Sequence, residues 1–283
     1  MITTTLLAAA LMAAPVQQLD TTVSVRGETR VALENMTGSV VVRSWDREDV
    51  RIQASNRTAV DINAGGPAVR IESRMRRGMP GRINYEITVP RRFGVEVEGI
   101  NLSVEVHDVT GDVTVETVNG GVTLNGVNGR ARVETVHGAL TVRDSRGNLG
   151  VETANGPITI VNHEGDIEAE ALNGPITLTG IRSAAVEAET LNGPIEYGGQ
   201  IRDGGRYSFS THAGNITLFV PEGTNAAVSI ETFAGEVEAD FPIQVRRMGR
   251  GEDMSFTLGD GSARIRIEAF GGRIRLRRPE GNL

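Results

Sequence analysis

Glycine recurs every nine residues through the middle of the chain, and this period limits the possible fold more than any other feature. Ser183 continues the spacing after the last of these glycines, and a one-residue insertion then shifts it to Gly193. A short fixed period over many units is typical of proteins in which each unit stacks on its neighbours. The period therefore predicts an elongated stack rather than a globule. The glycines lie at positions 111, 120, 129, 138, 147, 156, 165 and 174.

Within each nonad the apolar residues alternate with polar ones. If the nonads begin at residue 101, the fourth and sixth residues of every unit up to residue 181 are apolar, as in Val104 and Val106. The fifth residue is never hydrophobic, and Glu105 is the first example. Strict alternation of this kind indicates a short, half-buried β-strand of about four residues.

Two kinds of nonad alternate, so that the true period is 18 residues. One kind carries Val-Glu-Thr, as at 133–135, and the other carries Asn-Gly-Pro-Ile, as at 155–158. Two short strands and two glycine turns then form one coil, and successive coils stack about 4.8 Å apart. The predicted fold is all-β, a single-stranded β-solenoid with two short strands per 18-residue coil. Glycine at the corners allows positive φ, and the preceding Asn can form a ladder along the stack.

The length of the period separates this chain from two other solenoid families. Left-handed hexapeptide helices also use about 18 residues per coil, but they repeat an aliphatic residue every six. Calcium-binding nonapeptide repeats need a Gly-Gly-x-Gly-x-Asp turn in each unit. Here the repeat turns have one Gly each apart from Gly120-Gly121, and Asp follows the repeat glycine only at Asp112 and Asp166, which disfavours a calcium-binding roll.

The spacing between corners becomes longer and less regular toward the C-terminus. Similar corners occur at 212–216, 233–237 and 270–274, which predicts wider coils there. No aromatic residue lies between Phe93 and Tyr197, so the narrow coils have no room for rings and the wide coils can bury them. The candidates for burial are Tyr207, Phe209, Phe219, Phe233, Phe241, Phe256 and Phe270.

These patterns divide the chain into four parts. Residues 1–18 resemble a secretory signal peptide, with an apolar stretch too short to span a bilayer. Residues 19–92 read as a β-rich N-terminal cap, 93–200 as the regular solenoid of nonapeptide half-coils, and 201–283 as the wider C-terminal coils of the same solenoid. We expect no transmembrane span, and a secreted, periplasmic or cell-surface location.

Composition excludes several chemistries. All 29 basic residues are Arg, and the chain has neither Lys nor Cys, so a Schiff-base lysine, a cysteine nucleophile, a disulfide framework and a thiolate metal site are ruled out. The net charge of −7 is unevenly distributed: residues 93–242 carry 7 Arg against 22 acidic residues, whereas both flanks are basic. An acidic centre argues against nucleic-acid binding, which needs a continuous basic surface.

The chain resembles the DUF4097 family of bacterial β-solenoid proteins, which carries an adhesin label. The resemblance rests on Val89-Pro90-Arg91-Arg92-Phe93 followed by the Val-Glu-Thr-x-Asn-Gly coils, on Leu218-Phe219-Val220-Pro221, and on Leu258-Gly259-Asp260-Gly261 before the last coil. It covers nearly the whole chain after residue 18. It implies a solenoid fold and an envelope or surface location, and it supplies no catalytic residue.

The most ordered polar feature is a column of glutamates that repeat at one position of the coil. Like charges about 4.8 Å apart repel by about 1 kcal/mol in water before screening. The column could therefore be a solvated edge that blocks aggregation, or a strip that attracts cations or a basic partner. Its members are Glu116, Glu134, Glu152, Glu170 and Glu189.

Other candidate sites are weaker. The threonine column formed by Thr123, Thr141, Thr159 and Thr177 lacks the flat paired surface that ice binding needs, and β-propensity explains it. The four histidines occupy different coil positions, so we expect no metal site, no cofactor and no catalytic group. We expect a non-enzymatic envelope module, structural or adhesion-like, that recognises an unknown envelope or surface partner and could self-associate. The alternative is a carbohydrate-active β-helix enzyme that uses the wide C-terminal coils.

Overall fold

The regular coils form because the alternating nonads bury one face of each strand. In the computed structural model, which describes residues 18–27, 29–74, 81–244, 246–247 and 254–279, each predicted strand is present. The strands have up to eight residues rather than four, because the alternation continues through the Thr of Val-Glu-Thr to the corner. The predicted signal peptide lies almost wholly outside the described residues. The strands of the regular coils are β8 (Val113–Asn119), β9 (Val122–Asn125), β10 (Ala131–His137), β11 (Leu140–Arg146), β12 (Leu149–Asn155), β13 (Ile158–Glu164), β14 (Ile167–Asn173), β15 (Ile176–Ile181), β16 (Ala185–Asn192) and β17 (Ile195–Gly199).

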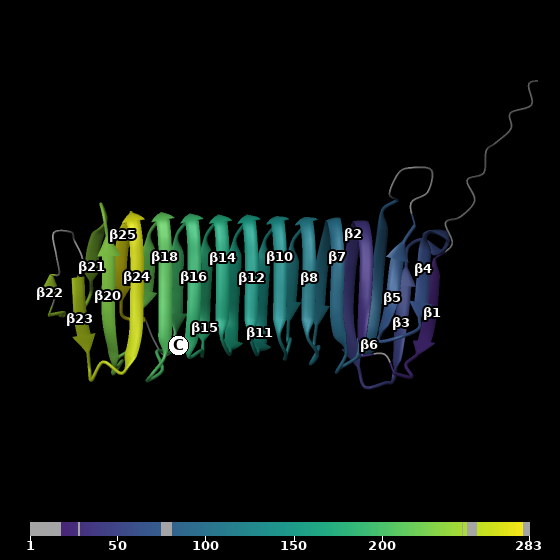
Figure 1. Ribbon diagram of the computed structural model, residues 1–283, viewed down its shortest axis with the longest axis horizontal. Helices are drawn as coiled ribbons and strands as arrows, with labels where there is room; N and C mark the ends of the chain where they lie inside the picture. Colours follow the sequence, from purple (N-terminus) through teal and green to yellow (C-terminus); the bar gives the residue numbers. More distant parts are fainter. Residues whose placement is uncertain (1–17, 28, 75–80, 245, 248–253, 280–283) are drawn as a thin grey trace, which may run out of the picture.

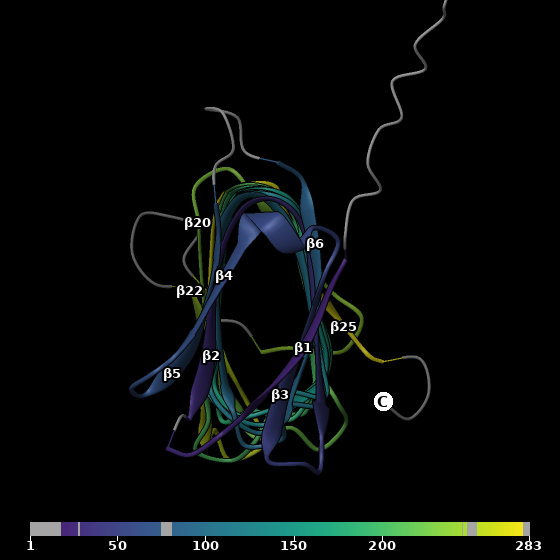
Figure 2. The same cartoon turned by 90° about the vertical axis from the view of Figure 1, so that its right-hand side faces the viewer.

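Successive coils pair in parallel with a shift of one period. Val133 of β10 lies beside Val115 of β8 and Val151 of β12, and Thr141 of β11 lies between Thr123 and Thr159 in the same way. The stack has two flat faces (Figures 1 and 2). We name them the even-strand face, formed by β8, β10, β12, β14, β16 and β18 (Arg206–Ala213), and the odd-strand face, formed by β9, β11, β13, β15 and β17. Apolar residues of both faces meet in a narrow core between them, which confirms the predicted all-β solenoid.

The corners explain the glycine spacing. Gly120 (φ 139°) and Gly147 (φ 118°) adopt the positive φ predicted for corner glycines, but Gly138 lies outside that region of backbone space. A Cβ atom on Gly138 would overlap the carbonyl oxygen of Gly120 in the coil below. Close stacking of coils is therefore the requirement that the corner glycines share. The predicted Asn ladder is present, since Asn173 Nδ2 donates to Asn155 Oδ1 at 3.1 Å.

The N-terminal region adds a further coil to the stack. β2 (Arg30–Trp45) bends at Gly38 and pairs in parallel along its length with β7 (Gly94–His107), so that it continues both faces. Strands β5 and β6 lie on its outer side, and antiparallel strands close the end. The remaining elements of this end are β1 (Leu19–Ser24), β3 (Asp49–Ala54), the 3-10 turn η1 (Arg57–Ala59), β4 (Val60–Ala64), β5 (Ala68–Ser73) and β6 (Ile83–Pro90).

The C-terminal coils do not stack in the order of the sequence. The last coil, β24 (Ala263–Gly271) and β25 (Arg273–Arg277), inserts between β18 (Arg206–Ala213) with β19 (Ile216–Phe219) and β20 (Ala226–Thr232) with β21 (Glu236–Ala239). The strands of these coils are about as long as the regular ones, with seven to nine residues on one face and four or five on the other. The loose spacing of the corners therefore reflects loops and edge strands rather than wider faces. The edge strands are β22 (Arg246–Arg247) and the antiparallel β23 (Met254–Leu258).

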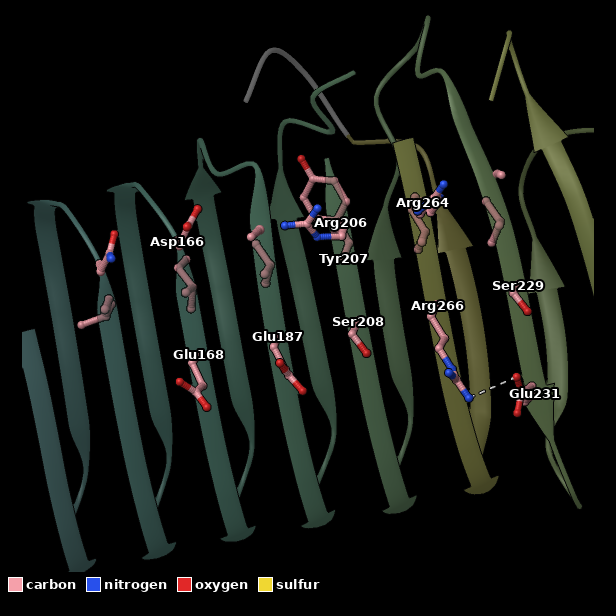
Figure 3. Close-up of a pocket in the computed structure, with 18 of the residues that line it drawn as sticks. Asp166, Glu168, Glu187, Arg206, Tyr207, Ser208, Ser229, Glu231, Arg264 and Arg266 are labelled. Carbon is pink, nitrogen blue, oxygen red and sulfur yellow. Dashed lines mark ion pairs between the residues drawn. The ribbon is translucent and has the colours of Figure 1, made fainter. Parts of the chain in front are cut away.

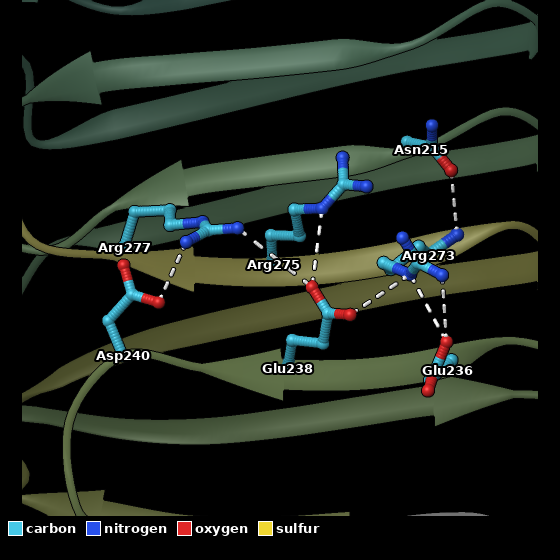
Figure 4. A network of polar contacts seen from close by, with 7 residues as sticks. All are labelled: Asn215, Glu236, Glu238, Asp240, Arg273, Arg275 and Arg277. Atoms are coloured by element: carbon cyan, nitrogen blue, oxygen red, sulfur yellow. Dashed lines mark hydrogen bonds and ion pairs between the residues drawn. The ribbon is translucent and has the colours of Figure 1, made fainter.

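An arginine ladder holds this inserted coil on the odd-strand face. Arg273 pairs with Glu236 at 3.0 Å, and Arg277 with Asp240 at 2.8 Å. Between them Glu238 contacts Arg275 at 3.4 Å (Figure 4). The basic C-terminal flank is thus partly neutralised by acids of the neighbouring coil.

Candidate functional site: a glutamate column beside an apolar ridge

The structure brings the five predicted glutamates together in one column on the even-strand face. Each pairs in register with the next, from Glu116 beside Glu134 on β8 and β10 to Glu170 beside Glu189 on β14 and β16. Arg132 pairs with Glu134 at 2.6 Å. Among the described residues no ion pair joins the other four, Glu116, Glu152, Glu170 and Glu189.

The column is longer than the repeat pattern predicted. The nine-residue spacing does not reach its ends, because β2 and β24 pair with coils that are distant in sequence. A local signal was nevertheless present, since Val97-Glu98-Gly99-Ile100-Asn101 follows the same pattern as Val115-Glu116-Thr117-Val118-Asn119. The additional members are Glu72, Glu34 and Glu98 at one end, and Glu268 and Glu231 at the other, beyond Ser210.

Burial and mutual repulsion shift two carboxyl groups of the column. Partial burial, followed by the charges of Glu116 and Glu34, raises the pKa of Glu98 above its ordinary value. Burial, followed by the neighbouring Glu152, raises the pKa of Glu170 in the same direction. These carboxylates therefore carry their charge at an electrostatic cost, which a bound cation would relieve.

An exposed apolar ridge, which the alternation pattern did not predict, runs beside the glutamate column. The side chain of the residue two positions after each glutamate also points outward, and this residue is apolar. Val136 is 40% exposed and Leu172 is 49% exposed. Single exposed apolar residues are ordinary, whereas a contiguous row of them is not. The signal was the variable position of Val-Glu-Thr-x-Asn-Gly, which is apolar in every coil. The ridge consists of the exposed residues Ile100, Val118, Val136, Leu172 and Leu191, with the half-buried Ala154 between Val136 and Leu172.

Three stacked rings extend the ridge toward the C-terminal end. Phe270 stacks on His212 with ring centroids 4.6 Å apart, and Phe233 stacks on Phe270 at 4.9 Å. Phe233 is 76% exposed and Phe270 is 51% exposed, so the expectation that these two rings are buried is wrong. They occupy the outward position next to the corner, and not a core position. Tyr207, Phe209 and Phe256 are buried as expected.

Between the column and the ridge lies an open groove of about 1000 Å³. The residue between each glutamate and its ridge neighbour points inward and forms the floor, as Thr153 does. The hydroxyl of the equivalent Thr190 donates to the carbonyl oxygen of Gly174 at 3.1 Å, so threonines at this position satisfy corner carbonyls. The groove thus has a charged wall and an apolar wall.

A second groove lies on the same face, closer to the C-terminal end (Figure 3). Glu168 and Glu187 line it from neighbouring strands, and Arg206, Arg264 and Arg266 lie beyond them. Arg266 contacts Glu231 at 3.4 Å. The enzyme alternative requires carboxylates that converge across a cleft, whereas Glu168 and Glu187 lie side by side along the stack.

The remaining sequence candidates form no shared site. Thr141 and Thr159 stack on the odd-strand face, within a column that ends in charged residues. His163 is buried, with its Nδ1 2.8 Å from Ser145 Oγ, and burial lowers its pKa. Within the described ranges no three His, Asp or Glu side chains are grouped as metal ligands. No helix in that part of the chain is long and apolar enough to cross a membrane.

Solved structures and a family model are similar to this chain. A "putative adhesin" from Parabacteroides distasonis ATCC 8503 aligns over 92% of this chain and 97% of its own, with 10% identity and a TM-score of 0.50. A "putative adhesin" from Bacteroides fragilis NCTC 9343 aligns over 92% and 97%, with 13% identity and a TM-score of 0.37. No curated protein matches the sequence. The model of one family, described as Toastrack DUF4097, matches residues 16–277, and the chain therefore belongs to the Toastrack DUF4097 family.

Proposed function

We propose that the protein is an exported, non-enzymatic β-solenoid that acts in the cell envelope or at the cell surface as an adhesion-like interaction module. Its contact surface is the strip formed by the glutamate column and the apolar ridge. The observation that carries the proposal is the continuity of the ridge, because a long exposed apolar row is costly in water unless another surface covers it. The carboxylate column repels phosphate groups, which supports a partner other than nucleic acid.

The location is tested first, by fractionation of cells that produce the full chain. We expect the protein in the periplasmic, envelope or extracellular fraction, together with loss of an N-terminal segment by mass spectrometry. Recovery in the cytosol alone would refute the export part of the proposal.

The contact surface is tested by replacing Val136 on the ridge with a photo-crosslinking residue in living cells. The matched control places the same residue at Thr141 on the odd-strand face of the neighbouring strand. We expect a covalent adduct with an envelope component from position 136 and none from position 141. Equal adducts from both positions, or none from 136, would contradict the assignment of this face.

A further inference from the structure

We propose that the strip binds a cationic amphipathic α-helix of a partner protein, which lies along the solenoid axis with its apolar face on the ridge. The inference rests on the proposed function and specifies the partner of the same surface.

The spacing of the ridge favours a helix over an extended segment. Ridge residues repeat about every 4.8 Å along the stack, so the six positions from Ile100 to Leu191 span about 24 Å. One helical turn advances about 5.4 Å, which is close to the spacing of the ridge residues. Over a helix of about 16 residues, the offset between the helical turns and the ridge residues therefore grows to only about 3 Å. An extended strand presents one face about every 6.8 Å, and it loses register after two coils.

The shape of the ridge provides a position for a large partner side chain. Ala154 lies between Val136 and Leu172 and is the smallest residue of the row. It leaves a notch in the middle of the ridge, where a Leu or Phe of the helix could insert between neighbouring coils. Insertion of a large side chain into a depression on a facing surface is how helices usually pack.

The charges on the two sides of the ridge are unequal. The glutamate column flanks one side, and on the corner side the side chains of Asn155, Asn173 and Asn192 form neutral amide contacts. A matching helix has Leu or Ile in its central stripe, Lys or Arg along one flank, and uncharged polar residues along the other. Cations on that flank would also relieve the repulsion between carboxylates such as Glu152 and Glu170.

Binding of a designed peptide to the purified chain tests the proposal. The probe is a fluorescently labelled 18-residue helix with a Leu stripe, one Lys flank and one Gln flank, and its comparison is a scrambled peptide of equal composition. We expect the amphipathic peptide to bind at least about tenfold more tightly than the scrambled one by anisotropy, because only the former presents an apolar stripe. Equal affinities for the two peptides would mean that charge attraction alone drives binding, and they would overturn the proposal. Association of the chain with lipid vesicles that is tighter than its binding to the amphipathic peptide would overturn it as well.

Paired variants locate the binding surface. Leu172→Ser with Leu191→Ser should weaken peptide binding about tenfold, and Glu152→Gln with Glu170→Gln about fivefold. The control with the same charge change, Glu105→Gln with Glu196→Gln on the odd-strand face, should leave binding unchanged. An equal loss in the control, with circular dichroism showing that all variants are folded, would contradict the assignment.

The two proposals fail in distinguishable ways. An adduct at position 136 in cells, without peptide binding in vitro, would keep the contact surface and refute the helical partner. Peptide binding that depends on Leu172 and Leu191, without any adduct in cells, would support the helix-binding groove and contradict the proposed envelope contact.

Discussion

At the scale of single residues, the glutamate column opposes folding at neutral pH. Glu170 has no ion-pair partner among the described residues, and its pKa is raised above the ordinary 4.5 by burial and by neighbouring carboxylates. The folded state therefore binds a proton more readily than the unfolded chain. It follows that this group makes the protein more stable as the pH falls from neutral toward 4.5, and less stable as the pH rises.

Glu170→Gln should accordingly raise the free energy of unfolding at pH 7 by about 0.5 kcal/mol at low salt. The gain should shrink as the pH approaches 4.5, where the wild-type carboxyl is increasingly protonated in the folded state. Urea denaturation at several pH values measures both effects. Glu134→Gln is the matched control: it removes the 2.6 Å ion pair with Arg132, so a gain in stability there would contradict the explanation.

At the scale of the element, the corner is the most constrained part of each coil. Gly138→Ala would place a methyl group against the carbonyl oxygen of Gly120, and a backbone atom of a stacked coil cannot move without shifting the whole coil. We expect a loss of about 2 kcal/mol in the free energy of unfolding. Gly150→Ala, on the surface of β12 with open space around the new methyl group, should be neutral or slightly stabilising. Equal losses in the two variants would show that stacking distance is not the cause.

At the scale of the whole molecule, the sequence predicted the parts of the solenoid in which the next coil in space is also the next coil in sequence. The ends could not be predicted in this way, because Val31 pairs with Val95 and Tyr207 pairs with Ile265. Such pairings join strands that are far apart in the sequence, so they produce no short repeat in it. The ridge was not predicted for another physical reason: near the corner the usual polarity of the alternation is reversed, because the polar Thr135 points inward and the apolar Val136 points outward.

This difference between the middle and the C-terminal end can be tested by two deletions of equal length. Deleting residues 155–172 removes one full period and joins Ala154 to Asn173, so that Glu152 becomes the neighbour of Glu189 and every core column stays in register. Because solenoid coils contact only their neighbours, we expect this variant to fold with a β-rich circular dichroism spectrum and a long axis shorter by about 4.8 Å in solution scattering.

Deleting residues 260–277 removes the same number of residues but takes away β24 and β25, on which β18 with β19 and β20 with β21 both pair. The edge of β18 and the strands beyond it lose their partners together, so we expect aggregation or a large loss of thermal stability. If this variant is as stable as the internal deletion, the inserted coil is not what holds the C-terminal end together. A failure of the internal deletion to fold would instead show that the coils are not interchangeable units.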